Sequence, residues 1–188
     1  MSFKSLVMSR IIAIITDQER RDKRVAKFET KRKHAGSSHE VIFFHDILDP
    51  YSHILLLILP DVFIGADIKL TCHLVSEPKD DVVPEREMLS GYAIEDAKIL
   101  AKKAGIECKF TPPEIEQANN ARSALAKAFV DSDIATARDI SIALWSGKNV
   151  SASDFDWKQA QINGTEQLYK LGHYMGVCCI MVVNGTGA

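Results

Sequence analysis

The sequence predicts an α/β fold in which a strand–helix–strand unit is followed by a large block of helices, and two observations support it. A nearly all-apolar strand at 40–48 runs straight into a helix-start signal, and a second strand follows that helix at 67–76. Beyond it, the stretch of about 77–170 reads as helices joined by short loops. A strand that is apolar on both faces is typical of a buried parallel sheet, whose crossover connections are right-handed.

The first 36 residues read as a basic helical extension, separate from a domain over 38–188. Residues 1–34 carry 10 Lys and Arg against 4 Asp and Glu, whereas the remainder carries 13 against 21. We expect one helix or a broken pair over 3–34, packed on the domain with a solvated charged tail, because charge runs are usually solvated faces. Its apolar side consists of Leu6, Ile11, Ile14 and Ile15.

The less favoured alternative is contact of this basic extension with anionic lipid or nucleic acid. Phe28 is the only aromatic residue between positions 4 and 42. Single-strand binding surfaces combine basic side chains with aromatic side chains on which bases stack. Nucleic acid is therefore not an expected partner.

The helix after the first strand begins at a strong start signal. Asp49 has a side chain suited to the N-cap position, where it accepts backbone N–H groups of the first turn. Pro50 suits the next position, because its fixed φ is helical and its missing N–H is not needed there. The predicted helix covers 51–64 and is bent or ended by Pro60. In the second strand, one face is formed by Ile68, Leu70, Cys72 and Leu74.

The helical block begins after a polar loop and ends before a short strand. Pro84 is expected to begin its first helix, which runs to about Ala104 and stops at Gly105. Ser153 or Asp154 is expected to cap its last helix. The remaining predicted elements are helices at 114–130 and 133–145, a last helix that reaches residue 169, and a strand at 177–183.

The segment Asp49-Pro50-Tyr51-Ser52-His53 resembles the active-site turn of the DsbA-like branch of the thioredoxin superfamily. This branch includes 2-hydroxychromene-2-carboxylate isomerases and kappa-class glutathione transferases, whose turn reads S-P-Y-S or S-P-W-S. The similarity covers roughly residues 38–176 and continues through Pro84-Glu85-Arg86-Glu87-Met88-Leu89, Ala143-Leu144-Trp145 and Leu171-Gly172-His173-Tyr174. These motifs resemble the first half of longer bacterial proteins with two such domains. The resemblance implies a thioredoxin-like fold with a large helical insertion at about 77–170.

The resemblance also implies a site at this turn. Asp49 takes the position of the first cysteine of C-x-x-C members, or of the glutathione-activating serine, and Ser52 takes that of the second cysteine. Asp49 and Ser52 are therefore the candidate catalytic residues, and Pro50, Tyr51 and His53 are the candidate substrate-binding residues. Dithiol exchange at this site is excluded, because neither Asp nor Ser can form a disulfide. Glutathione is the candidate ligand, as a small-molecule thiol, and no bound cofactor is expected.

Two features depart from the pattern of these enzymes. A carboxylate at Asp49 would repel a bound thiolate by roughly 1–4 kcal/mol, and the helix end favours the ionised carboxyl. The cis-proline loop expected after Leu171-Gly172-His173-Tyr174 contains no proline, since the last one in the chain is Pro113. The sequence therefore leaves open whether catalysis survives, and whether Asp49 belongs to a ligand site or is a plain N-cap.

Residues 177–188 do not resemble the family, whose chains continue with an aromatic strand hairpin. One permitted back-translation of 176–188, read two bases later, encodes G-V-L-H-Y-G-G-E-W-Y-W-G, which resembles that hairpin. The hypothesis is a truncated form of a longer protein, with a sheet left incomplete at the C-terminus. An open sheet edge and uncovered apolar helix faces favour pairing with a second copy or another chain, and marginal stability.

Composition narrows the class of protein. The 188 residues are 46% apolar and 26% charged, as in a globular domain with a substantial core. The four cysteines form no C-x-x-C and no zinc spacing, which fits reduced thiols and a cytoplasmic location. No segment reaches the roughly 18 apolar residues of a membrane span. His45, His53 and His73 lie on separate predicted elements, so no metal site is expected.

The favoured function is that of a DsbA-family, thioredoxin-like protein without the C-x-x-C dithiol. By resemblance, it is related to glutathione-linked isomerases and transferases and to thiol-disulfide oxidoreductases. The alternative is a non-catalytic scaffold or interaction module of the same fold, with the basic N-terminal helix as its contact surface.

Overall fold

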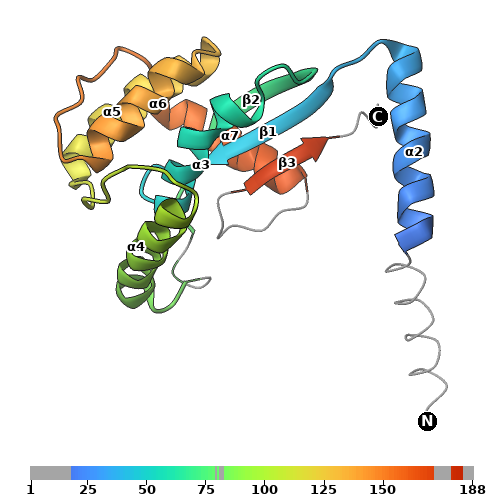
Figure 1. The fold of residues 1–188 in the computed structure, drawn as a ribbon. Coiled ribbons are helices and arrows are strands. Elements are labelled where there is room, and N and C mark those ends of the chain that lie inside the picture. Colours follow the sequence, from blue (N-terminus) through green and yellow to red (C-terminus); the bar gives the residue numbers. More distant parts are fainter. Residues whose placement is uncertain (1–17, 79, 81–82, 172–178, 184–188) are drawn as a thin grey trace, which may run out of the picture. The chain divides into compact units, whose positions relative to one another are not determined.

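The computed structural model of the chain describes residues 18–78, 80, 83–171 and 179–183. It contains helices and strands in mixed order, as the α/β prediction requires (Figure 1). The chain divides into two units, one of residues 41–66 and 70–181 and one of residues 1–40, 67–69 and 182–188. The predicted division into an extension over 1–36 and a domain over 38–188 stays a prediction.

The smaller unit contains helix α2, Gln18–Ala35. Arg32 is its best-connected side chain, with the Glu29 carboxylate at 2.8 Å and the Asp67 carboxylate at 3.0 Å. Gly36 ends the helix with a φ of 62°, a left-handed conformation that glycine adopts without strain. The helix predicted over 3–34 is thus confirmed from residue 18 onward.

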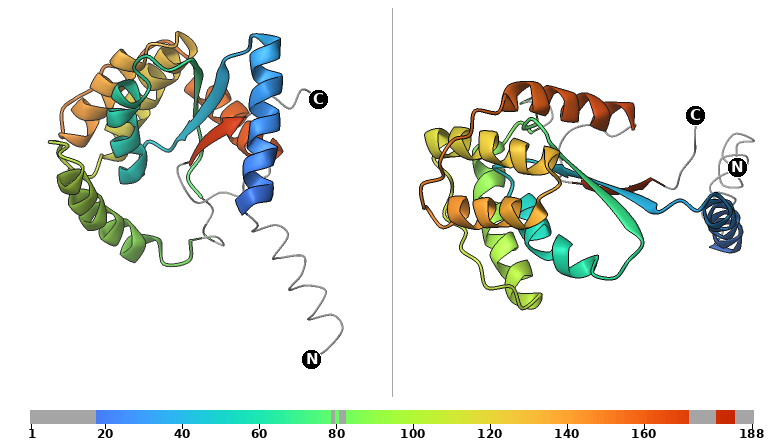
Figure 2. Two further views of the ribbon diagram at one scale, coloured as in Figure 1. Left: turned by 45° about the vertical axis from the view of Figure 1, so that its right-hand side comes forward. Right: turned by 90° about the horizontal axis from the view of Figure 1, so that it is seen from above.

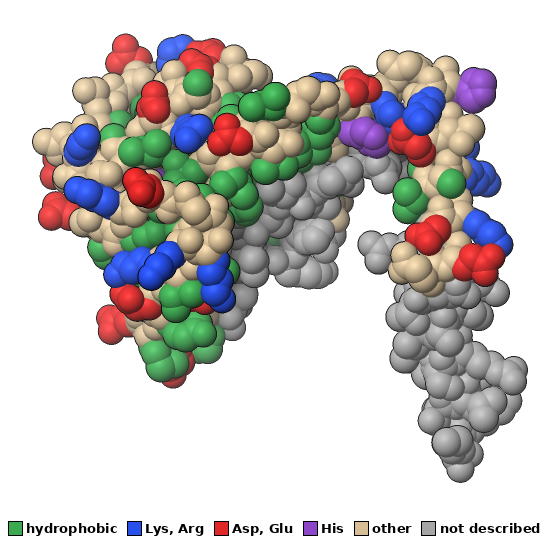
Figure 3. All heavy atoms as spheres, in the orientation of Figure 1, with side chains coloured by type: hydrophobic (Ala, Val, Ile, Leu, Met, Phe, Trp, Pro, Cys, Tyr) green, Lys and Arg blue, Asp and Glu red, His purple; other side chains and the backbone are tan. Residues whose placement is uncertain are grey.

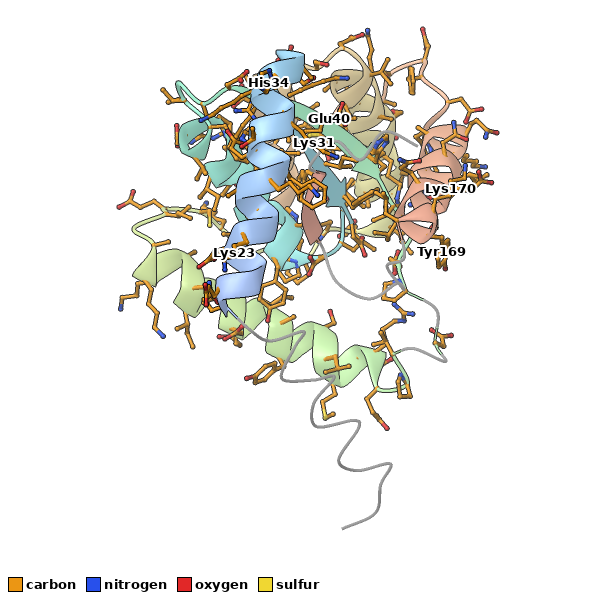
Figure 4. All side chains as sticks on the ribbon, turned by 90° about the vertical axis from the view of Figure 1, so that its right-hand side faces the viewer. Lys23, Lys31, His34, Glu40, Tyr169 and Lys170 are labelled. Carbon is orange, nitrogen blue, oxygen red and sulfur yellow. The ribbon has the colours of Figure 1, made fainter. Side chains whose placement is uncertain are left out.

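Basic side chains project from the surface of α2, as Figure 4 shows for Lys23, Lys31 and His34. Most of the described side chains of this helix are exposed, in agreement with a solvated charged face. The predicted apolar side, formed by Leu6, Ile11, Ile14 and Ile15, lies outside the described residues.

The sheet has the strand order β2-β1-β3. Its strands are β1 at His39–His45, β2 at Ile68–Leu74 and β3 at Cys179–Val183. The N–H of His39 donates to the carbonyl of Asp67 at 3.0 Å. At the other end of the pair, the N–H of Val75 donates to the carbonyl of His45 at 3.0 Å. Both strands advance in the same direction between these bonds, so β1 and β2 are parallel, and the predicted strand–helix–strand unit is confirmed.

The alternation of side chains along β1 sends neighbouring residues to opposite faces of the sheet. Phe43 packs into the main core with Leu56 and Leu59 of helix α3, Pro50–Val62. Phe44 packs instead with Leu168 of helix α7, Trp157–Lys170. The two helices therefore cover opposite faces of the strand pair, as the two views of Figure 2 show.

The helical block after β2 is confirmed. Its members are α4 at Arg86–Lys103, α5 at Ile115–Val130, α6 at Ile134–Trp145 and the α7 helix. Figure 1 shows α5 and α6 lying side by side, and they pack through the small buried residues Ala126, Ala128 and Ala137. Pro60 lies inside α3, which ends two residues later, in agreement with the prediction that this proline limits the helix.

Two predicted helix starts are wrong. The last helix is capped by Asp156, whose carboxylate accepts the backbone N–H groups of Lys158 and Gln159, and neither Ser153 nor Asp154 caps it. The hydroxyl of Ser153 is occupied elsewhere, since it donates to the carbonyl of Ser123 in α5. The first helix of the block begins at Arg86, two residues after Pro84.

Candidate functional site

The predicted turn lies between the end of β1 and the start of α3. The carboxylate of Asp49 accepts the backbone N–H of Ser52 at 2.8 Å and that of Tyr51 at 3.3 Å. Pro50 occupies the first helical turn. Asp49 is therefore the N-cap that the sequence predicted, and it satisfies two N–H groups that would otherwise have no helical partner.

Asp46, at the carboxyl end of β1, is the second carboxyl of the turn and is only 9% exposed. Its Oδ1 accepts the backbone N–H of Leu48 at 3.0 Å. Burial raises the pKa of Asp46 to about 7, and the negative charges of Asp49 and Glu77 act in the same direction. This carboxyl consequently changes its charge close to neutral pH.

The pKa of Asp49 is also raised, because burial outweighs the hydrogen bonds that it accepts from Ser52 and Tyr51. The N–H groups at the helix end favour the ionised form of this carboxyl, as expected, but burial has the larger effect on its pKa. Two carboxyls with raised pKa values thus share the amino end of α3. Like charges at short range favour a state in which the pair keeps a proton.

Ser52 and His53 are both fully buried. The hydroxyl of Ser52 accepts the backbone N–H of Asp46 at 3.2 Å, which ties the first turn of α3 to the end of β1. The Nδ1 atom of His53 lies 2.7 Å from the Ser141 hydroxyl of α6. Of the predicted site residues, Asp49 and Tyr51 are partly exposed, whereas Pro50, Ser52 and His53 are buried. The catalytic and substrate-binding roles assigned to these five residues stay predictions.

Tyr51 turns toward the helical insertion. Its hydroxyl donates to the Asp96 carboxylate of α4 at 2.8 Å. Burial and this carboxylate raise the pKa of Tyr51 to about 12, so the phenol stays protonated at neutral pH. It can therefore act as a hydrogen-bond group and not as a base.

His53 and His45 are both fully buried imidazoles. His53 stacks on Trp145 with ring centroids 5.5 Å apart, and its pKa is lowered to about 4 by burial. The pKa of His45 is lowered to about 3 by burial and by the nearby His53. Neither ring nitrogen of His45 has a hydrogen-bond partner among the described residues. Both rings are neutral at physiological pH.

A cluster of charged side chains lies close enough to Asp46 to act on its pKa. Arg122 of α5 is 8% exposed and lies 3.4 Å from the Glu77 carboxylate. Arg86 at the start of α4 lies 3.7 Å from the same carboxylate. Sequence reasoning missed Arg122, Asp96 and Ser141, because each comes from the insertion and no local motif connects them with the turn.

The three histidines for which no shared metal site is expected lie on different elements, His45 on β1, His53 on α3 and His73 on β2. His73 stacks on Phe44 with ring centroids 5.6 Å apart. Across the described residues, no group of three or more His, Cys, Asp or Glu side chains gathers as a metal site would require. Cys72 is buried and Cys108 is partly buried, and both are free thiols.

A solved structure shares this arrangement of elements. It is that of a 2-hydroxychromene-2-carboxylate isomerase, with a TM-score of 0.55 and 13% sequence identity over 78% of this chain and 86% of that one. At this identity the likeness shows the fold, which is thioredoxin-like with an α/β architecture. No protein-family profile matches the sequence. No curated protein matches it either.

Within the described part of the chain, no helix combines the length and the apolar character that crossing a membrane would require.

Proposed function

We propose that this chain binds a low-molecular-weight thiol, with glutathione as the first candidate, at the amino end of α3. The observation that carries this proposal is the pair of carboxyls, Asp46 and Asp49, with raised pKa values at a helix N-terminus. Exchange of a dithiol at this turn is excluded, because its residues contain no sulfur. The proposed activity is accordingly related to the glutathione-linked isomerases and transferases.

The carboxyl pair removes the main objection to an aspartate at this position. An ionised Asp49 would repel a thiolate, but a pair that keeps one proton presents a donor to it instead. The positive end of α3 then favours the negative charge of the ligand. Binding of the thiolate form should become weaker as the pH rises through about 7, because Asp46 loses its proton there.

Calorimetric titration with glutathione at pH 6 and pH 8 tests this proposal. The affinity is expressed per thiolate, because the thiolate fraction of glutathione itself rises with pH toward the ordinary thiol pKa of about 8.5. On this scale we expect the wild-type chain to bind about tenfold more tightly at pH 6 than at pH 8, which corresponds to the loss of one charge repulsion of about 1.4 kcal/mol. Asp46→Asn keeps a side-chain oxygen that can accept the Leu48 N–H and cannot ionise, so its affinity for the thiolate should change little with pH. S-methylglutathione, which cannot form a thiolate, is the matched ligand control and should bind more weakly to both proteins.

Absence of binding at millimolar glutathione in both proteins would reject the thiol-binding proposal. It would favour the alternative, a non-catalytic scaffold or interaction module. That alternative is supported by exposed apolar residues on one stripe of α4, where Met88, Tyr92 and Ile99 are 67%, 68% and 52% exposed. Such a stripe on the surface of a single chain is typical of a contact surface.

The basic surface of α2 supplies a second contact surface for this alternative. A nucleic-acid partner would show an affinity that falls steeply with salt concentration. A flat salt response in a binding experiment would remove that partner and leave a protein or anionic surface.

We also propose that the reading frame changes after residue 176 and that the complete product is a longer, cytoplasmic, two-domain protein. The support is the resemblance of the alternative frame to the aromatic hairpin of related chains. Sequencing the gene through this region is the direct test. A continuous frame that encodes the hairpin and a second domain would support it, and a confirmed stop after Ala188 would reject it.

A further inference from the structure

The end of α4 forms the wall of an open hollow that is separate from the carboxyl pair. The N–H of Ile106 donates to the carbonyl of Ala101, and the N–H of Gly105 donates to that of Lys102. These two bonds are those of a Schellman motif, and the φ of 70° at Gly105 is the left-handed conformation that the motif requires. The chain therefore folds back sharply and continues along the helix that it has just left.

The hollow between this returning segment and α4 has a volume of about 620 Å³. Small-molecule sites commonly have volumes of about 300–1,000 Å³. The hollow has an apolar floor and a charged rim. Its apolar floor consists of Ala101, Ile106, Cys108 and Phe110.

The rim of this hollow is basic. Lys98, Lys102 and Lys109 line it, and Glu107 is the only acidic residue among the residues that line it. Lys98 is paired with Glu95 at 2.6 Å, whereas neither Lys102 nor Lys109 forms an ion pair within the described chain. Figure 3 shows Lys and Arg side chains gathered among hydrophobic ones over α4.

The carbonyl groups at the end of α4 would ordinarily oppose an anion, because a helix C-terminus carries partial negative charge. Here the carbonyls of Ala101 and Lys102 are already engaged by the Schellman bonds, which leaves the ammonium groups as the dominant charges at the rim. The floor supplies apolar contact area, including the aromatic ring of Phe110. The apolar floor suits a ligand with an apolar body, and the basic rim suits an acidic group on that body.

We propose that this hollow binds a small organic anion with a flat apolar body, such as an aromatic carboxylate or sulfonate. Lys102 and Lys109 pair with its acidic group, and Ile106 and Phe110 contact its ring. The Cys108 thiol is part of the wall and undergoes no reaction with the ligand. The hollow is lined by none of the residues of the carboxyl pair, so this site is independent of the proposed thiol site.

The test uses 8-anilinonaphthalene-1-sulfonate as the probe, because it combines an apolar aromatic body, a naphthalene and a phenyl ring, with one sulfonate. Fluorescence titration of the full chain should saturate at one strong site. The double variant with Lys102→Glu and Lys109→Glu should bind at least about tenfold more weakly, because two attractive charges become repulsive. Lys103→Glu is the matched control, since Lys103 lies in the same helical turn and does not line the hollow. It should retain the wild-type affinity within about twofold.

Alkylation of Cys108 by iodoacetamide gives a second readout that locates the probe. Saturating probe should slow the modification of this thiol, measured by mass spectrometry of the peptide that contains it, and should not slow it in the double variant. Equal binding by the double variant and the control, or unchanged alkylation of Cys108 at saturation, would overturn the proposal. All substituted lysines are exposed, so the variants should fold, and thermal unfolding verifies this.

Discussion

Asp49 stabilises the start of α3 through the two backbone N–H groups that its carboxylate accepts. Asp49→Ala should lower the free energy of unfolding by about 1 kcal/mol, the usual effect of losing an N-cap. Asp49→Asn should retain most of this contribution, because asparagine is an equally good cap. Urea unfolding of the three proteins at pH 7 measures the difference. Equal stability of wild type and Asp49→Ala would show that the capping bonds contribute nothing.

His45 is a buried polar residue whose loss of hydration is not offset by hydrogen bonds within the described chain. It packs edge-to-face against Phe43 and Phe129, and neither of its ring nitrogens has a hydrogen-bond partner in the described chain. His45→Phe should raise the free energy of unfolding by about 1–3 kcal/mol, since unsatisfied buried polar atoms are removed while the aromatic packing is kept. Urea unfolding at pH 7.5 is the measurement. A less stable variant would mean that the imidazole has a partner, such as a buried water.

Acid should destabilise the wild-type chain through these same residues. The folded pKa values of His45 and His53, about 3 and about 4, lie below the ordinary 6.5, so their contribution is complete above pH 6.5 and is lost as the pH falls. Asp46 has the opposite effect between pH 3.8 and about pH 7, where it stabilises the fold more as the pH falls. In this range the folded chain keeps the proton on Asp46 and the unfolded chain releases it. Summed over these three groups, the unfolded chain binds about one proton more than the folded chain between pH 4 and 6.5. The free energy of unfolding therefore falls by about 1.4 kcal/mol for each unit by which the pH is lowered.

The pH dependence gives a second, independent prediction for His45→Phe. With His45 removed, the contributions of His53 and Asp46 to the pH dependence nearly cancel. The free energy of unfolding should therefore change little between pH 6.5 and 4.5. Unfolding of both proteins at pH 4.5, 5.5 and 6.5 measures the two slopes. Identical slopes would show that His45 does not lose its neutral state on unfolding.

At the scale of elements, α7 approaches the sheet through a glycine. A Cβ atom at Gly164 would lie 2.1 Å from the carbonyl oxygen of Leu74 in β2, a contact that requires the helix to move. Gly164→Ala should therefore lower the free energy of unfolding by about 3 kcal/mol. Gly91→Ala in α4 is the matched control, because a Cβ there meets nothing within 4 Å. It should be neutral or stabilising by up to about 1 kcal/mol.

Thermal unfolding of the two alanine variants distinguishes close packing from helix propensity. If both variants gain stability, α7 does not lie against β2 at this position. The sequence contains both glycines inside predicted helices and does not distinguish them, since the difference depends on β2, about 90 residues away in the chain.

At the scale of the whole molecule, the described sheet has β1 at its centre and β2 and β3 as its outer strands. Outer strands offer unpaired backbone groups to another chain. We expect the purified 188-residue chain to self-associate and to unfold without a sharp transition. Sedimentation velocity and differential scanning calorimetry over a range of protein concentrations measure both properties. A monomer with one cooperative transition would contradict the prediction that this form is incomplete.

The sequence by itself determined the elements and their order. The cap at Asp49, the stop at Gly105 and the apolar run of β1 are local signals, because they depend on residues within one or two turns of each other. They predicted a strand–helix–strand unit followed by helices, and the resemblance of the turn predicted the fold. The sequence predicted Ser153 or Asp154 as the cap of α7, whereas the Ser153 hydroxyl donates to the carbonyl of Ser123 in α5 and Asp156 caps the helix.

Only the tertiary structure decided the electrostatic character of the turn. The sequence contains Asp46 and His45 but shows neither their burial nor the charges around them, which come from Glu77, Arg122 and His53. A pKa depends on the dielectric surroundings and on charges in space, and these are supplied by segments far apart in the chain. The same holds for the basic hollow, whose wall is formed only when the segment after Gly105 folds back on α4.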